Sequence, residues 1–165
     1  MKEIPLTKGQ VARVDDEDFE YLSQFNWNAH EEGKTCYAYR GIANGKKRRT
    51  NIKMHREIMK VTKGIEVDHV DGDGLNNCRS NLRLCTHQQN HFNTSSRRNS
   101  SSKYKGVIWD KSRGKWQAKI KHGGKTVHLG RFASEDTAAT AYNRAAMEFY
   151  GEFARLNIIE EALCG

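Results

Sequence analysis

The stretch VDHVDGDGLNN, Val67–Asn77, decides how the first half of this chain is organised. It places three aspartates around one histidine, and NLRLCTHQQNHF follows closely. The alternation of polar and apolar residues over Asn81–Cys85 predicts a strand. Thr86 with Gln89 three residues later fits a capping box, which predicts a helix that begins at His87. The segment is therefore expected to form strand, loop, strand and helix.

The acidic cluster lies in a chain of 165 residues whose formal net charge is +8, from 28 Lys and Arg against 20 Asp and Glu. The basic excess is concentrated in residues 93–132, which hold eleven basic side chains and one acidic one. Residues 133–165 hold two basic and six acidic side chains. This uneven distribution favours a polyanion partner over an evenly solvated surface. A cation between the carboxylates and a phosphate would reconcile the acidic cluster with such a partner.

Two other metal sites can be compared with this segment. An EF-hand does not fit, because with Asp71 as the first position the sixth is Asn76 and the twelfth is Leu82, where glycine and glutamate are needed. A zinc site stays open as an alternative, although the close cysteine pairs of structural zinc sites are absent from the sequence. It would use Cys78, Cys85, His87 and His91.

The residues from Tyr104 onward predict three short antiparallel strands, YKGVIWD, KWQAKIK and KTVHLGRF, which are separated by the turns KSRG and HGG. The middle strand alternates, so Trp116, Ala118 and Ile120 share one face. Its other face carries Lys115, Gln117, Lys119 and Lys121. A basic sheet face of this kind can enter the major groove of DNA.

A helix is expected to cover the apolar face of this sheet. Ser134 can cap it, and acidic residues in its first turn suit the positive end of the helix dipole. An apolar stripe follows, and Gly151 marks the end. The stripe consists of Ala138, Tyr142, Ala145 and Phe149.

Several motifs in this half occur in a fixed order: YKGV, W-x-A-x-I, HLGRF, AAxAYNRAA and G-x-x-A-x-x-N. From Ser102 to Asn157 they resemble the Apetala/ethylene-response-factor DNA-binding domain. The resemblance implies a three-stranded sheet in the major groove, with contacts from Lys105, Lys119, Lys121 and His128, and Lys115 shares the same face. Base preference does not transfer, because plant members carry arginine or tryptophan at several positions. These positions are Ile108, Asp110, Thr126 and His128.

The first half resembles the HNH nuclease family in the order DH…NN…NL…N over Glu66 to Asn93. The resemblance implies a ββα-metal core that binds Mg²⁺ or Mn²⁺. By motif position, His69 would be the general base and Asn81 a brace for its loop. The metal ligands would be Asp68 and Asn90. The last family position is often histidine, so His91 and His87 stay open as ligands.

These residue types suit the cleavage of a phosphodiester. A neutral imidazole, with an ordinary pKa of about 6.5, can accept a proton from water near neutral pH. Carboxylate and amide oxygens are hard ligands that suit Mg²⁺ or Mn²⁺. Asp71 and Asp73 are better interpreted as turn residues.

Other basic residues are candidate phosphate contacts. Asn44-Gly45 predicts a hairpin, whose far arm supplies three of them; Asn93–Lys103 has the composition of a linker and supplies two more. A solvated surface is the alternative for both segments. The five residues are Lys47, Arg48, Arg49, Arg97 and Arg98. A short helix is expected after Asp15, and His55 is expected to be a packed structural residue.

The sequence therefore predicts an α+β protein. Residues 1–92 would form a ββα-metal nuclease core with an N-terminal β-rich buttress, 93–103 a linker, and 104–165 a three-stranded antiparallel sheet packed on one helix. The expected function is that of an HNH endodeoxyribonuclease of phage or intron homing type, a monomer that nicks double-stranded DNA. A non-catalytic DNA-binding transcription regulator and an RNA-processing nuclease are the alternatives. With no apolar run of about 20 residues and no signal peptide, we expect a soluble, cytoplasmic protein that does not bind membranes.

Overall fold

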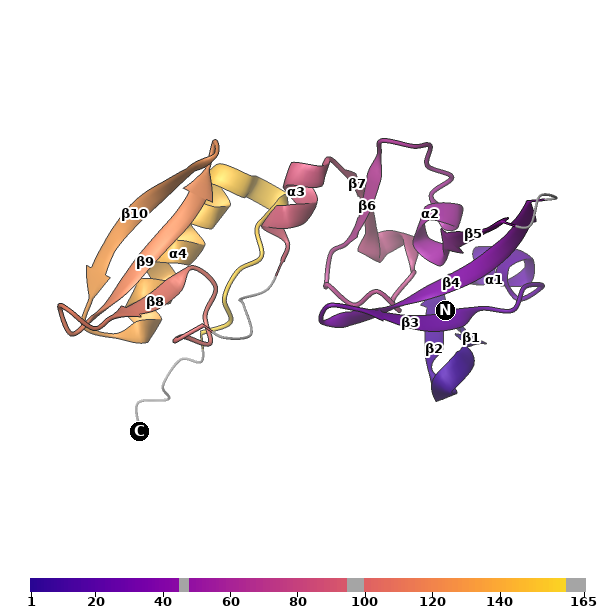
Figure 1. The fold of residues 1–165 in the computed structure, drawn as a ribbon, viewed down its shortest axis with the longest axis horizontal. Helices are drawn as coiled ribbons and strands as arrows, with labels where there is room; N and C mark the ends of the chain where they lie inside the picture. Colours follow the sequence, from indigo (N-terminus) through magenta and orange to yellow (C-terminus); the bar gives the residue numbers. More distant parts are fainter. Residues whose placement is uncertain (45–47, 95–99, 160–165) are drawn as a thin grey trace. The chain divides into compact units, whose positions relative to one another are not determined.

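The computed structural model describes residues 1–44, 48–94 and 100–159. The chain divides into two compact units, Met1–His91 and Phe92–Gly165. Both combine helices with antiparallel sheets (Figure 1), so the mixed α and β class expected from the sequence is confirmed. No helix in the described part of the chain has the length and apolar character needed to cross a membrane.

The N-terminal part of the first unit contains a two-stranded hairpin and a three-stranded sheet in the order β3-β4-β5, all antiparallel. Three short helices accompany them, and the one that begins at Asp16 carries acidic residues in its first turn, where they favour the helix dipole. The strands are β1 (Lys2–Pro5), β2 (Val11–Val14), β3 (Asn28–Glu32), β4 (Thr35–Asn44) and β5 (Arg48–Lys53); the helices are η1 (Thr7–Gly9), α1 (Asp16–Leu22) and α2 (Met54–Ile58).

One hydrophobic core holds this unit together. Ile4, Val14, Leu22 and Met54 are almost completely buried in it, and Val67 joins it from the segment that carries the acidic cluster. The N-terminal sheets therefore pack on the expected nuclease segment.

That segment has the predicted order of strand, loop, strand and helix: β6 (Glu66–His69), β7 (Leu82–Cys85) and α3 (His87–Phe92). The strands pair antiparallel. The helix begins at His87 as predicted, and the capping box forms, because Gln89 N donates to Thr86 Oγ1 and Thr86 N donates to Gln89 Oε1. The second strand begins one residue later than predicted, because Asn81 ends the short helix η2 (Arg79–Asn81).

The loop between β6 and β7 packs closely on its neighbours. Arg13 N in β2 donates to Leu75 O at 2.9 Å, and Asn77 N donates to Arg13 O at 2.8 Å. On the other side, a Cβ at Gly74 would lie 2.5 Å from Cys36 O in β4. Only glycine permits this approach, so the loop has a fixed position in the unit.

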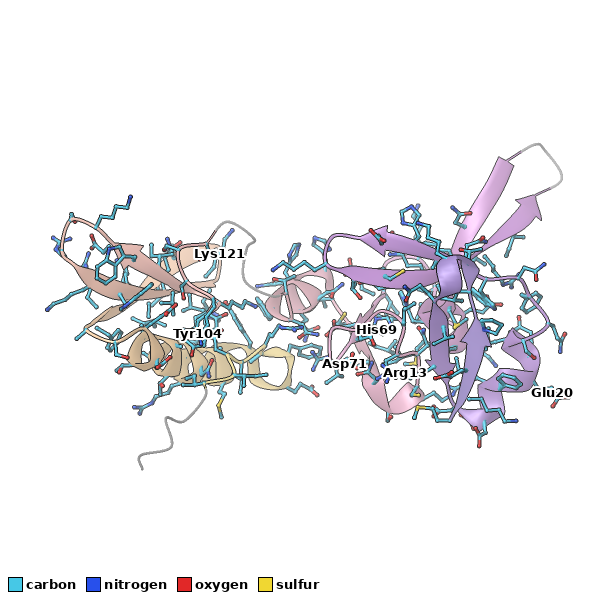
Figure 2. The ribbon with its side chains drawn as sticks, turned by 90° about the horizontal axis from the view of Figure 1, so that it is seen from below. Arg13, Glu20, His69, Asp71, Tyr104 and Lys121 are labelled. Carbon is cyan, nitrogen blue, oxygen red and sulfur yellow. The ribbon has the colours of Figure 1, made fainter. Side chains whose placement is uncertain are left out.

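The second unit is a three-stranded antiparallel sheet in the order β10-β9-β8, with one long helix against one face (Figure 1). Tyr104 lies between sheet and helix (Figure 2), in a core cluster with Val107 and Ala138. The elements are β8 (Val107–Asp110), β9 (Lys115–His122), β10 (Lys125–Phe132), α4 (Glu135–Tyr150) and η3 (Gly151–Phe153).

The predicted cap and stop of this helix are confirmed. Ser134 accepts a hydrogen bond from Asp136 N, and Gly151 ends the helix with a positive φ of 53°. The end of the expected linker, around Ser102, is packed and does not form a free segment. Ser102 is buried and its hydroxyl donates to Glu135, so this residue is a packed part of the second unit.

Candidate active site and nucleic-acid interface

His69 is the last residue of β6 and is only 4% exposed. Its Nε2 lies 3.3 Å from Asn77 Oδ1, and its ring centroid lies 4.8 Å from that of His55 and 5.7 Å from that of Tyr37. Burial lowers the pKa of His69, and the Asn77 contact opposes this effect. The imidazole is therefore neutral near pH 7, the form that can accept a proton. Figure 2 shows His69 near Arg13 and Asp71 in the first unit.

His55 lies in α2 and packs against His69, as expected for a structural histidine. Burial lowers the pKa of His55 to about 2, with His69 adding to the shift. Two neutral histidines therefore lie in edge-to-face contact.

Asp68 is buried and paired with Arg83, a residue that the sequence did not indicate. Arg83 Nε and Nη2 donate to Asp68 Oδ2 at 3.0 and 2.7 Å. The two residues face each other because they are register partners on β6 and β7. The carboxylate expected to hold a metal is thus held by a guanidinium in this structure.

Asn81 holds the loop rather than the His69 ring. Its Oδ1 accepts from Asp71 N at 3.1 Å, and its Nδ2 donates to Asp71 Oδ1 at 2.9 Å and to Asn76 O at 2.8 Å. The interpretation of Asp71 and Asp73 as turn residues agrees with their contacts, since Asp71 Oδ1 also accepts from Asp73 N. The asparagine that contacts His69 is Asn77, which the sequence analysis did not single out.

The polar residues of α3 gather around Glu66 of β6. Asn90 Nδ2 donates to Glu66 Oε2 at 2.7 Å, and His87 Nδ1 lies 2.7 Å from Glu66 Oε1. The Asn90 hydrogen bond is the main cause that lowers the pKa of Glu66. His91 Nε2 lies 3.2 Å from His87 Nε2.

Within residues 1–44, 48–94 and 100–159, no group of three or more His, Cys, Asp or Glu side chains is arranged to hold a metal ion. Cys78, Cys85, His87 and His91, the residues of the zinc alternative, all lie in the described part and form no such group. The assignment of Asp68, Asn90 and His91 as metal ligands stays a prediction. The carboxylate of Asp68 and the amide oxygen of Asn90 are hard donors that fit Mg²⁺ or Mn²⁺, with water and phosphate as further ligands.

The sheet of the second unit has the basic face that the sequence predicts. Lys119 of β9 pairs with His128 of β10, and Lys121 pairs with Thr126, so these side chains share the face away from α4. Lys121 is exposed and Lys119 is half-buried. Gln117 Nε2 donates to His128 Nδ1 at 3.1 Å, which fixes one side of this face.

An ion pair lies at one end of the same sheet. Asp110 of β8 accepts from Arg131 Nε at 2.9 Å, and this pair and Ser112 lower the pKa of Asp110 to about 2, with the Ser112 hydrogen bond the largest cause. Lys115 is exposed opposite Asp110. The face is therefore basic but carries one carboxylate.

Lys105 differs from the other lysines. Its ammonium donates to Phe92 O at 2.5 Å, and burial lowers its pKa to about 8. The side chain is thus held within the second unit. Among the remaining candidates, Lys47, Arg97 and Arg98 lie outside the described residues; Arg48 and Arg49 belong to β5, and their side chains are not described.

Comparison with known proteins finds a match for each half of the chain. A family model described as HNH endonuclease matches residues 60–92, and one described as AP2 domain matches residues 102–152. An uncharacterized HNH endonuclease of Acanthamoeba polyphaga mimivirus is 34% identical over 159 residues, which cover 93% of this chain and 78% of the relative. This chain belongs to the HNH endonuclease family.

Two further relatives match parts of this HNH endonuclease. Protein 3.8 of Escherichia phage T7 is 33% identical over 95 residues, 58% of this chain and 78% of the phage protein. An AP2-like ethylene-responsive transcription factor of Arabidopsis thaliana is 42% identical over 62 residues, 38% of this chain and 13% of the plant protein. No solved structure matches the chain.

Proposed function

We propose that this HNH endonuclease hydrolyses phosphodiesters of double-stranded DNA with a divalent cation, Mg²⁺ or Mn²⁺. Its first unit would cut and its AP2 domain would select the site. The observation that carries the proposal is the buried, neutral His69 beside Asp68, at the place where the HNH family model matches. A phage- or intron-type homing role is part of the proposal, and two of the relatives come from a mimivirus and from an Escherichia phage.

The residues of the first unit would divide the chemistry among themselves. His69 would take the proton from the attacking water, because burial keeps its imidazole uncharged. Asn81 would keep the loop in place through Asp71. Asp68 and Asn90 would hold the cation, with His91 or His87 as a further ligand. A bound divalent cation would supply charge stabilisation at the phosphate and help for the departing oxygen.

The Asp68–Arg83 pair bears on this assignment. Arg83 neutralises Asp68 in the chain alone, and a cation would compete with the guanidinium for Oδ2. Once displaced, an arginine beside the centre could bind a phosphate oxygen, which suits its forked donors.

Recognition would come mainly from the second unit. The proposed contacts on the sheet are Lys115, Lys119, Lys121 and His128, all on the face away from α4. Lys105 is left out of this set, because its ammonium is bound to Phe92 O. The basic residues of the hairpin tip and of the linker stay as candidate phosphate contacts. They are Lys47, Arg48, Arg49, Arg97 and Arg98.

One experiment tests the enzyme against a protein that only binds DNA. Supercoiled plasmid is incubated with the full chain and Mg²⁺, Mn²⁺ or EDTA, and the products are separated on a gel. We expect open circles with either metal and intact plasmid with EDTA. Binding to a labelled duplex without cleavage under every metal condition would instead indicate a non-catalytic regulator. Cleavage of RNA alone would indicate the RNA-processing alternative.

A further inference from the structure

Asn77 is a completely buried polar residue whose amide contacts three different groups. Its Nδ2 donates to Leu75 O at 3.1 Å and lies 3.5 Å from Gly74 O, while its Oδ1 lies 3.3 Å from His69 Nε2. Its own backbone N donates to Arg13 O. Both ends of the side chain are therefore occupied.

These contacts decide which amide atom faces His69. If the amide were turned over, its oxygen would face the carbonyl oxygens of Gly74 and Leu75. Acceptors would then oppose acceptors in a site without access to water, which is costly. The hydrogen-bonding network therefore places the oxygen of Asn77 toward the ring.

The two carbonyls cannot easily move away. A Cβ at Gly74 would lie 2.5 Å from Cys36 O and 2.6 Å from Tyr37 Cδ1, so the backbone there lies directly against β4. Leu75 O accepts a second hydrogen bond, from Arg13 N of β2. The turn is thus held from both sides, and the orientation of Asn77 is fixed with it.

An amide oxygen accepts hydrogen bonds and cannot donate one, so the nitrogen that faces it must carry the proton. A neutral imidazole has one N–H, and its second nitrogen then carries the lone pair. We propose that Asn77 is a positioning residue that fixes the Nε2–H tautomer of His69 and so makes Nδ1 the nitrogen that accepts the proton from water. The catalytic part of this inference rests on the proposed role of His69 as the base.

Asn81 provides the matched control. It lies in the same segment and holds the same loop, but its side-chain amide donates to Asp71 Oδ1 and Asn76 O. A change in loop stability alone would therefore follow either substitution. A change in the His69 tautomer should follow only the loss of Asn77.

The test is the tautomer of His69, measured by long-range ¹H–¹⁵N NMR on the metal-free full chain with ¹⁵N-labelled histidine. His69→Gln identifies the signal among those of the seven histidines. We expect a pyrrole-like Nε2 and a pyridine-like Nδ1 in the wild type and in Asn81→Ala. In Asn77→Ala the signals should indicate a mixture of tautomers or the Nδ1–H form.

A wild-type His69 that carries its proton on Nδ1 would overturn the proposal, whether or not Asn77→Ala folds. Equal changes in Asn77→Ala and Asn81→Ala would overturn it as well. For turnover we expect Asn77→Ala to slow plasmid nicking by about 10-fold to 100-fold, the usual effect of losing a partner that orients a histidine.

Failure of the proposed function would look different. If His69→Ala nicked plasmid at the wild-type rate, His69 would not be the base, whatever tautomer the NMR spectrum gives. The NMR spectrum therefore tests the tautomer of His69, and the nicking rate of His69→Ala tests whether His69 is the base.

Discussion

We expect Asp68 to stabilise the fold, whether or not it also binds a metal ion. Its carboxylate and the Arg83 guanidinium are both mostly buried, with side-chain exposures of 6% and 16%. Removing one member of such a pair costs more than removing both. We expect Asp68→Ala to lower the free energy of unfolding by about 3 kcal/mol.

The double variant Asp68→Leu/Arg83→Met should recover part of this loss, and urea unfolding of the single and double variants measures it. Equal stability of Asp68→Ala and the wild type would show that the pair contributes little. Activity lost in Asp68→Ala must therefore be compared at matched folded fraction.

His69 is the residue on which the proposed chemistry depends most. His69→Ala should slow plasmid nicking by about 10²-fold to 10⁴-fold, the usual contribution of a general base. Affinity for a labelled duplex should stay unchanged, because a buried ring is not a surface contact. His30→Ala, which removes an exposed histidine of β3, is the control. A loss of only a few-fold in His69→Ala would point to another base.

For single residues, the sequence predicts which types of side chain the site contains better than it predicts which partners those side chains contact. The spacing of Asp68, His69 and Asn90 agrees with the HNH motif, but it does not say which of the neighbouring asparagines contacts His69. That choice depends on how the loop packs against β2 and β4, which is a tertiary effect. Arg83 was missed for a related reason, because its position opposite Asp68 depends on the strand register.

At the scale of elements, the loop between β6 and β7 depends on Gly74. Gly74→Ala would place a methyl group against Cys36 O and the ring of Tyr37. We expect the loop to shift, with a lower melting temperature and slower nicking. Asn76→Ala changes the same loop without adding volume and is the comparison. If Gly74→Ala had the melting temperature and nicking rate of the wild type, β4 would be able to move aside for the methyl group without loss of stability or activity.

The basic face of β9 and β10 predicts that the salt dependence of DNA affinity changes when a lysine of this face is removed, but not when a lysine of the opposite face is removed. Each phosphate contact contributes about 0.9 to the slope of log affinity against log salt on duplex DNA. Lys119→Ala and Lys121→Ala should each reduce the slope by about this amount. Lys125→Ala is the control, since Lys125 pairs with His122, whose ring stacks on Phe149 of α4. Equal slopes for all three variants would place DNA elsewhere.

The elements themselves were largely predictable. The three strands and the helix of the second unit follow local patterns: alternation over Lys115–Lys121, the Ser134 cap and the Gly151 stop. The inward position of Lys105 was not predictable, because its partner is a main-chain carbonyl thirteen residues away. The burial of Ser102 was also missed, since a serine-rich composition gives no sign of its contact with Glu135.

At the scale of the whole molecule, each unit has core clusters made of its own residues. Removal of residues 101–165 should therefore leave a folded first unit. We expect this fragment to bind duplex DNA more weakly and to nick with less sequence preference. Circular dichroism and a nicking assay on several plasmids measure these effects. An unfolded fragment would show that the first unit needs the second.

The sequence carries one DH…N…N set, so under the proposed function one chain would cut one strand in each binding event. We expect supercoiled plasmid to become open circles first, with linear product late. Light scattering should give the mass of a monomer, 18.9 kDa. Early linear product at low enzyme concentration, together with the mass of a dimer, would contradict this prediction.

Because the two units have separate cores, they can evolve independently. A mutation that refines one core changes nothing in the packing of the other, so natural selection can act on cutting and on recognition one at a time. If the second unit selects the site, as proposed, a gene that joins such units could exchange that unit by recombination between the two cores and keep a first unit that cuts. Under the proposed division of roles, lineages of this enzyme could acquire new target sites in one step, without passing through an inactive ancestor.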